Sequence, residues 1–286
     1  MHIVMGATGH VGSAVAETLL ARGQPVGIIT HDPAHADSWR DTKAEIIEAD
    51  VNDVRSLRAA FQRGRRAFVL NPPAGIETDT DKVERSTAAN ILAALSDSGL
   101  EKIVVESTAG AQPGDRIGDL NVLWELEEGV RSQSIPAAIN RAPYYFSNWD
   151  EQLGPVRDTG KLRTMYPADL ALPMAAPRDL GRAAADRMLS PPAEGGVLYI
   201  EGPDRYSSND VAQAFAKALG RPVEVVVTPR HQWEAAYREL GFSDSAASSY
   251  ARMTAVSLDC GFDNDERPVR GDTTLDEYIG QLVARS

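Results

Sequence analysis

Three glycines spaced Gly-x-x-Gly-x-x-Gly near the start of the chain constrain its fold more than any other feature. They lie in the stretch Gly6-Ala7-Thr8-Gly9-His10-Val11-Gly12. The apolar residues 2–5 before them predict a buried strand, and residues 13–21 after them carry apolar side chains at helical spacing. The glycines therefore occupy a strand-to-helix turn, where an α/β fold can bind a phosphate group.

Both the glycines and the helix that follows them favour an anion at this turn. Glycine lets the backbone turn tightly and approach a ligand closely. The first N–H groups of a helix have no partner within the helix and lie at the positive end of its dipole. The spacing differs from the Gly-x-Gly-x-x-Gly of the most familiar dinucleotide fingerprint. We predict a dinucleotide site here rather than a purely structural turn, formed by Gly6, Thr8, Gly9, His10, Val11 and Gly12.

The composition is that of an ordinary globular protein. The chain has 286 residues, of which 43% are hydrophobic and 24% charged. No apolar run approaches the roughly 18 residues that a membrane span needs, and we expect no membrane association. A net charge of −12 disfavours direct nucleic-acid binding. A single cysteine, Cys260, and no visible signal peptide fit a reducing cytoplasm.

Strand-like and helix-like segments alternate along the first half of the chain. The strands are expected at 26–30, 44–50, 66–70, 102–106 and 135–140, and the helices at 53–63, 78–98 and 119–133. This alternation predicts an α/β fold of the Rossmann type, a doubly wound parallel sheet with right-handed crossovers. We expect residues 1–150 to form the dinucleotide-binding domain, with residues 175–205 returning to it. Residues 151–286 should mostly form a smaller C-terminal α+β lobe for a substrate or partner.

The end of the second predicted strand faces the adenosine ribose in folds of this type. An acid there binds the 2′-hydroxyl of NAD, and an arginine accepts the 2′-phosphate of NADP. Thr30-His31-Asp32 is neither case. A protonated His31 could meet a phosphate, and Asp32 a hydroxyl, so NAD and NADP both fit. The alternative is that both side chains are solvated loop residues.

Other candidate residues follow the later strands. Asp50 and Val51 end the third strand where an adenine ring would lie, and Asn71 ends the fourth beside the cofactor. Ser107 and Thr108 end the fifth, where hydroxyls could hold a substrate carbonyl or the nicotinamide amide, or cap a turn.

Aromatic residues gather in the run from Arg141 to Trp149. Tyr144 and Phe146 suit the wall of an apolar pocket or a core segment equally, and Asn148 could orient a substrate. A histidine pair, His31-x-x-x-His35, has metal-ligand spacing, but Pro33 interrupts it and it lies where the ribose should bind. We therefore expect no metal site.

The order of these motifs resembles the NmrA-like branch of the atypical short-chain dehydrogenase/reductases, which bind NAD(P). Each matching segment is loose alone, but their shared order along nearly the whole chain is hard to obtain by chance. The segments are Gly6 to Gly12, Glu48 to Asp53 (the family's Gly-Asp-(Leu/Val)-x-Asp), Arg141 to Trp149, Ala176 to Gly181 (its Arg-Asp-(Ile/Leu) segment) and Glu201-Gly202-Pro203.

The departures from the family pattern bear on function. Relatives that prefer NADP usually carry arginine where Thr30-His31 stands. None of the 8 tyrosines has a lysine four residues later, so the Tyr-x-x-x-Lys proton relay of many short-chain dehydrogenases is missing. A lysine common in related proteins would fall near Leu123, and this chain has no lysine there. The remaining catalytic candidates are Thr108, Tyr144 and Tyr145.

Two functions fit these observations. The first is an oxidoreductase that uses NAD(P)H to reduce a small carbonyl or quinone-like substrate, because the cofactor does the chemistry and the protein needs only to position the reactants. The second is a non-catalytic regulator that senses NAD(P) and acts through a protein partner, as the missing Tyr-Lys pair suggests. The aromatic run favours a substrate, so the enzyme is the first hypothesis.

Overall fold

Eight parallel strands form the central sheet of the structure, a computed structural model that describes residues 1–261 and 267–285. Its strand order is β13-β10-β6-β5-β4-β1-β2-β3, and the register of each neighbouring pair is parallel. The strands are β1 (His2–Val4), β2 (Val26–Thr30), β3 (Glu45–Glu48), β4 (Arg66–Val69), β5 (Lys102–Thr108), β6 (Ala137–Ala142), β10 (Gly196–Glu201) and β13 (Val269–Arg270).

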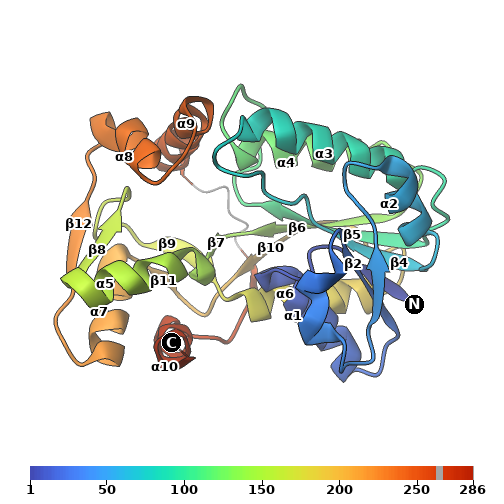
Figure 1. Cartoon of the computed structure of the whole chain (residues 1–286), viewed down its shortest axis with the longest axis horizontal. Coiled ribbons are helices and arrows are strands. Elements are labelled where there is room, and N and C mark those ends of the chain that lie inside the picture. Colours follow the sequence, from blue (N-terminus) through green and yellow to red (C-terminus); the bar gives the residue numbers. More distant parts are fainter. Residues whose placement is uncertain (262–266, 286) are drawn as a thin grey trace.

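Helices cover both faces of this sheet (Figure 1). One face carries α1 (His10–Ala21) and α6 (Pro177–Leu189), which pack against each other. The other face carries α2 (Val54–Phe61), α3 (Thr80–Leu95) and α4 (Asp119–Arg131). The α/β prediction of a doubly wound parallel sheet is thereby confirmed.

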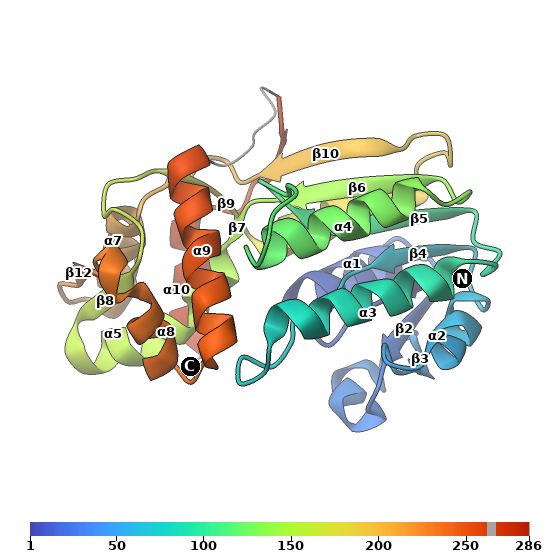
Figure 2. The same ribbon diagram turned by 90° about the horizontal axis from the view of Figure 1, so that it is seen from above.

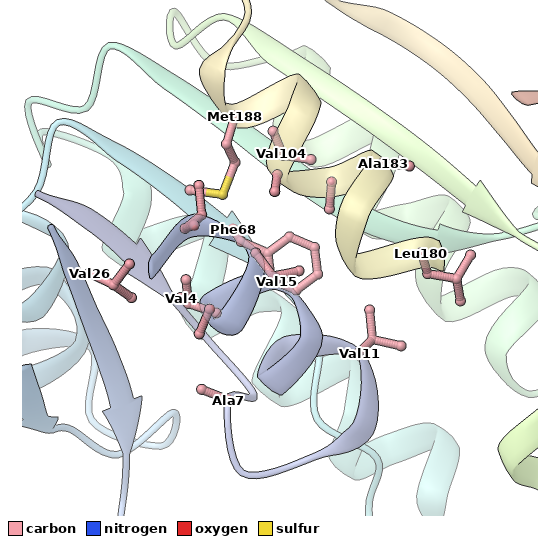
Figure 3. Packing of buried hydrophobic residues seen from close by; sticks show 14 of the residues in the cluster. Val4, Ala7, Val11, Val15, Val26, Phe68, Val104, Leu180, Ala183 and Met188 are labelled. Carbon is pink, nitrogen blue, oxygen red and sulfur yellow. The ribbon is translucent and has the colours of Figure 1, made fainter. Parts of the chain in front are cut away.

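The core under α1 and α6 supports the glycine-rich turn between β1 and α1 (Figure 3). Phe68 and Val104 project from the sheet and meet Val15 of α1 and Met188 of α6, all fully buried. Burying such side chains contributes roughly 1.5–3 kcal/mol each. The core thus fixes the start of α1 against the carboxyl ends of the strands.

The rest of the chain forms a second group of elements beyond the carboxyl ends of the large sheet, toward which β6 and β10 point (Figure 2). Its core includes Phe146, Trp149 and Phe215. Two small sheets contribute, β11 (Arg205–Tyr206) with β9 (Leu172–Ala175) and β7 (Tyr144–Tyr145), and β12 (Glu224–Val227) with β8 (Lys161–Thr164). The helices are α5 (Leu153–Thr159), α7 (Ser208–Leu219), α8 (Trp233–Glu239), α9 (Asp244–Cys260) and α10 (Leu275–Arg285).

The C-terminal half contains short strands that the sequence does not predict. The two-residue strands β7, β11 and β13 are too brief for a periodic pattern to show. β10 pairs with β6 and so lies in the large sheet. The boundary between a dinucleotide-binding domain and a C-terminal lobe stays a prediction. Over the described residues, no helix combines the length and apolarity that crossing a membrane requires.

Candidate functional site

The turn between β1 and α1 is shaped by contacts that only glycine permits. Gly6 has a φ of +69°, a conformation that side chains disfavour. A Cβ added to Gly12 would lie 2.2 Å from the Gly6 carbonyl oxygen, far inside van der Waals contact. The Gly9 N–H donates to that same oxygen at 2.9 Å, which closes the turn. The helix therefore starts directly against the end of β1.

The N-terminus of α1 is left open toward solvent. Gly9 is its N-cap, no side-chain hydrogen bond caps it, and its first turn carries no acid. Thr8, Gly9 and His10 are exposed, whereas Val11 and Gly12 are buried. Uncapped N–H groups at the positive end of a helix make a site for an anion.

Trp39 supports the turn from a segment between β2 and β3 for which the sequence analysis predicts no element. The short 3₁₀ helix η1 (Pro33–Trp39) follows β2. The Trp39 side chain is 4% exposed, and its indole N–H donates to the Ala7 carbonyl at 3.1 Å. A tryptophan inside an otherwise polar stretch was the available signal, but nothing in the sequence connects it with residue 7.

The end of β2 brings His31, Asp32 and His35 close together at the surface. The Asp32 carboxylate caps η1 by accepting the Ala34 N–H at 2.8 Å. The rings of His31 and His35 are 5.9 Å apart, and His35 approaches Asp32 at 3.9 Å. In the described part of the chain, no group of three or more His, Cys, Asp or Glu side chains is arranged to hold a metal ion. Because the Asp32 carboxylate caps η1, its role is structural. The His31 side chain is exposed and could contact a ligand.

The ends of β3 and β4 lie at the same edge of the sheet. Asp50 is exposed and caps its own turn through the N–H of Asn52 at 2.8 Å, and Val51 is partly buried beside it. The Asn71 side chain is held by α3, because its Nδ2 donates to the Glu84 carbonyl at 3.0 Å and its Oδ1 accepts from Thr87 at 2.8 Å. The Asn71 side chain is thereby committed to α3.

Ser107 at the end of β5 belongs to a buried polar network. Its hydroxyl donates to Glu127 at 2.6 Å. Glu127 is 0% exposed and is bound through both carboxylate oxygens by Arg141, each at 2.9 Å. Arg141 also donates to the Tyr199 hydroxyl at 2.7 Å. The network joins α4 to β5, β6 and β10 and thereby fixes the edge at which the neighbouring Thr108 ends β5.

The aromatic run divides between an edge of the sheet and the second core. Tyr144 and Tyr145 are partly buried, and the Tyr144 ring contacts Trp149 and Tyr166 with centroids 5.6 and 5.8 Å apart. Asn148, four residues after Tyr144, is exposed. Phe146 is 0% exposed and packs between other aromatic rings, so it serves the core rather than an open pocket.

Buried carboxyl groups at this edge were not singled out from the sequence. Burial raises the pKa of Glu84 to about 7, helped by the charge of Asp119. Burial raises the pKa of Glu106 to about 8, although Asn140 donates to it at 3.4 Å. Burial and then the charges of Glu106 and Asp119 raise the pKa of Tyr145. An acid at the start of a helix, such as Asp119, is usually explained by its favourable interaction with the helix dipole. The sequence therefore offers no reason to single out Asp119 as a functional group.

These features define an α/β protein of the Rossmann class whose open helix N-terminus and carboxyl-edge groups face a second, smaller set of elements. The chain belongs to the NmrA-like family, whose sequence profile matches residues 2–279. The resemblance drawn from the motifs is thus confirmed.

The proteins similar to this chain match most of its length. The chain is 23% identical over 257 residues to an NAD(P)H azoreductase from Xenophilus azovorans, covering 90% of this chain and 87% of the relative. It is 28% identical over 260 residues to the nitrogen metabolite regulation-like protein bik4 from Gibberella fujikuroi, covering 83% and 72%. The Escherichia coli NADPH-dependent quinone oxidoreductase QOR2, solved with NADPH, superposes with a TM-score of 0.81, 21% identity and 99% coverage of both chains.

Proposed function

We propose that this protein is an oxidoreductase that uses NAD(P)H to reduce a small quinone-like, azo or carbonyl acceptor without a Tyr-Lys proton relay. The observation that carries the proposal is the uncapped N-terminus of α1 above a turn in which Gly12 cannot carry a side chain. That cradle suits a pyrophosphate. The similarity to an azoreductase and to the fold of a quinone oxidoreductase supports the same conclusion.

The cofactor would extend along the carboxyl edge of the sheet. Its pyrophosphate would lie against residues 6–12, its ribose against His31, its adenine beside Asp50 and Val51, and its nicotinamide near Asn71 and Thr108. The Ser107 hydroxyl, which donates to Glu127, would help to hold the end of β5 in place beside the cofactor. The nicotinamide would supply a hydride. With an exposed histidine and no arginine at the end of β2, both NAD and NADP fit.

Calorimetric titration with NAD, NADH, NADP and NADPH tests this function. We expect saturable binding of at least one reduced form, followed by loss of its absorbance when a quinone, an azo dye or an aldehyde is added. Failure of all four nucleotides to bind would refute the proposal.

A second candidate function is an NAD(P)-sensing regulator that acts through a protein partner. The absence of any Tyr-x-x-x-Lys spacing and the similarity to a regulation-like protein favour it. Tight nucleotide binding without turnover of any acceptor would select this function over the enzyme.

The indole of Trp39 gives a sharper test of where the nucleotide binds. We expect Trp39→Phe to lower dinucleotide affinity several-fold and to cost about 1–2 kcal/mol of stability, because the buried Ala7 carbonyl loses its donor. The matched control is Trp233→Phe, which removes a similar bond from the indole of Trp233 in α8 to the Thr228 carbonyl at 2.9 Å. Calorimetry and thermal unfolding should show both variants less stable, but only Trp39→Phe weaker in binding. Equal affinity of the two variants would mean that the ligand does not contact this turn.

A further inference from the structure

Two carboxyl groups lie near the starts of α3 and α4, which meet where the Asn121 side chain of α4 donates to Asp81 of α3 at 3.3 Å. Glu84, on α3, is 2% exposed, and its Oε1 accepts the Ala74 N–H at 2.9 Å. Its backbone carbonyl accepts from Asn71 at 3.0 Å. Asp119 is the first residue of α4, which packs beside α3. Both acids are therefore tied to the segments that follow β4 and β5.

The two groups share an environment that disfavours two negative charges. Burial and then the charge of Asp119 raise the pKa of Glu84 to about 7. Burial raises the pKa of Asp119 as well. A carboxyl group with a pKa raised to about 7 still holds a proton for part of the time at neutral pH.

An unpartnered hydroxyl lies one helical turn from Glu84. Thr80 is 1% exposed, and within the described residues its Oγ1 has no hydrogen-bond partner. Thr80 and Glu84 are four residues apart and so share the buried stripe of α3. A buried polar group without a partner costs free energy unless water or a ligand satisfies it. The edge beside Glu84 thus offers a place for a polar ligand atom.

Groups from several elements surround this pair. Asp81 lies one turn before Arg85 on α3 and pairs with it at 2.7 Å, and Arg116 pairs with Asp79 at 2.9 Å. The strong cations nearby are therefore committed to other carboxylates. The other titratable groups that face the pair or its neighbours are Tyr145 on β7, Glu106 on β5, Tyr237 on α8 and Tyr250 on α9.

We propose that the Glu84–Asp119 pair donates the proton that a neutral acceptor needs when it is reduced. This inference rests on the proposed function, in which reduced nicotinamide supplies the hydride. The carboxyl O–H bond breaks and a new O–H or N–H bond forms on the acceptor, leaving a carboxylate that water reprotonates. The pair takes the place of the missing tyrosine and lysine.

The charge of the acceptor decides whether this proton is needed. A neutral azo compound or quinone gains a hydride and must also gain a proton. A triarylmethyl cation gains only the hydride at its central carbon and becomes neutral. The proposal therefore predicts that the pair matters for the first kind of acceptor and not for the second.

Variants of the two acids test the proposal against both kinds of acceptor. We expect Glu84→Gln and Asp119→Asn to lower kcat for an azo dye by roughly tenfold to a hundredfold, in the range of general acid catalysis. kcat for a triarylmethyl cation should change little. With the unaltered protein, kcat for the azo dye should fall as pH rises above about 7, because the acid must be protonated to donate. The control is Asp115→Asn, an exposed carboxylate before α4.

Infrared difference spectra of the protein without cofactor provide a readout independent of turnover. A carboxylic-acid carbonyl band should disappear as pH is raised through about 7, and it should be absent from the Glu84→Gln, Asp119→Asn double variant. Thermal unfolding of each variant shows whether it keeps its fold.

Several outcomes would overturn the proposal. Equal losses with the azo dye and the triarylmethyl cation would show that the variants disturb binding rather than proton transfer. Glu106→Gln alone removing azo reduction would assign the proton to Glu106. A band that does not titrate would also exclude the pair. No turnover of either acceptor would instead refute the reductase function, on which the inference rests.

Discussion

Substituting Gly12 by alanine is expected to weaken dinucleotide binding on the order of a hundredfold or more, about 3 kcal/mol. The new Cβ would lie 2.2 Å from the Gly6 oxygen, 2.3 Å from its carbonyl carbon and 2.7 Å from the Met5 oxygen. These are backbone atoms and cannot rotate away. The turn must open, and the first N–H groups of α1 lose the direction that an anion requires.

Gly9→Ala distinguishes an effect on ligand binding from an effect on stability at the same turn. Its Cβ would meet only the Gly6 oxygen, at 3.5 Å, in ordinary contact. We therefore expect Gly9→Ala to unfold near the temperature of the unaltered protein while binding dinucleotide more weakly, because the methyl group stands where the pyrophosphate approaches. Gly12→Ala should lose both stability and binding. Gly154→Ala, with no atom within 4 Å of its added Cβ, is the neutral control.

Calorimetry with NADH and NADPH, together with thermal unfolding, measures these three variants. Retained affinity in Gly12→Ala would contradict the placement of the pyrophosphate at this turn. An unchanged affinity in Gly9→Ala would mean that the ligand stays farther from the backbone than proposed.

The large sheet was predictable because its signals are local. A buried parallel strand reads as a short apolar run and the helix after it as an amphipathic repeat, as β1 and α1 show. The glycine-rich turn could be placed because glycine residues at fixed spacing between a strand and a helix have few other uses.

The missing parts of the site depend on contacts distant in sequence. Trp39 reaches the turn across 32 residues, and the Ser107 hydroxyl is committed to Glu127 across 20. A sequence pattern shows which residue types are present, but not which of two possible partners a side chain takes. The raised pKa of Glu84 likewise depends on burial between α3 and the segment after β4. Such features arise only when separate elements pack.

The second large effect is expected from Arg141, at the centre of the buried network. Arg141→Met should cost about 3 kcal/mol, because the Glu127 carboxylate, 0% exposed, loses two charge-assisted hydrogen bonds and cannot be hydrated instead. Arg131 still reaches Glu127 at 2.8 Å and keeps the cost from rising further. The midpoint of thermal unfolding should fall by roughly 6–12 °C.

A matched pair of variants tells a buried ion pair from an exposed one. Arg230→Met removes a partner of Asp259 at 2.7 Å on the surface, and we expect no measurable change in its unfolding temperature, since exposed pairs contribute little. The Arg141→Met, Glu127→Leu double variant should recover part of the stability lost in Arg141→Met, because it leaves no unpaired buried charge. If Arg141→Met unfolds at the temperature of Arg230→Met, water reaches Glu127, and the network cannot be what holds the end of β5 in place. If the double variant is no more stable than Arg141→Met, Ser107 and the other partners of the network contribute more than the ion pair itself.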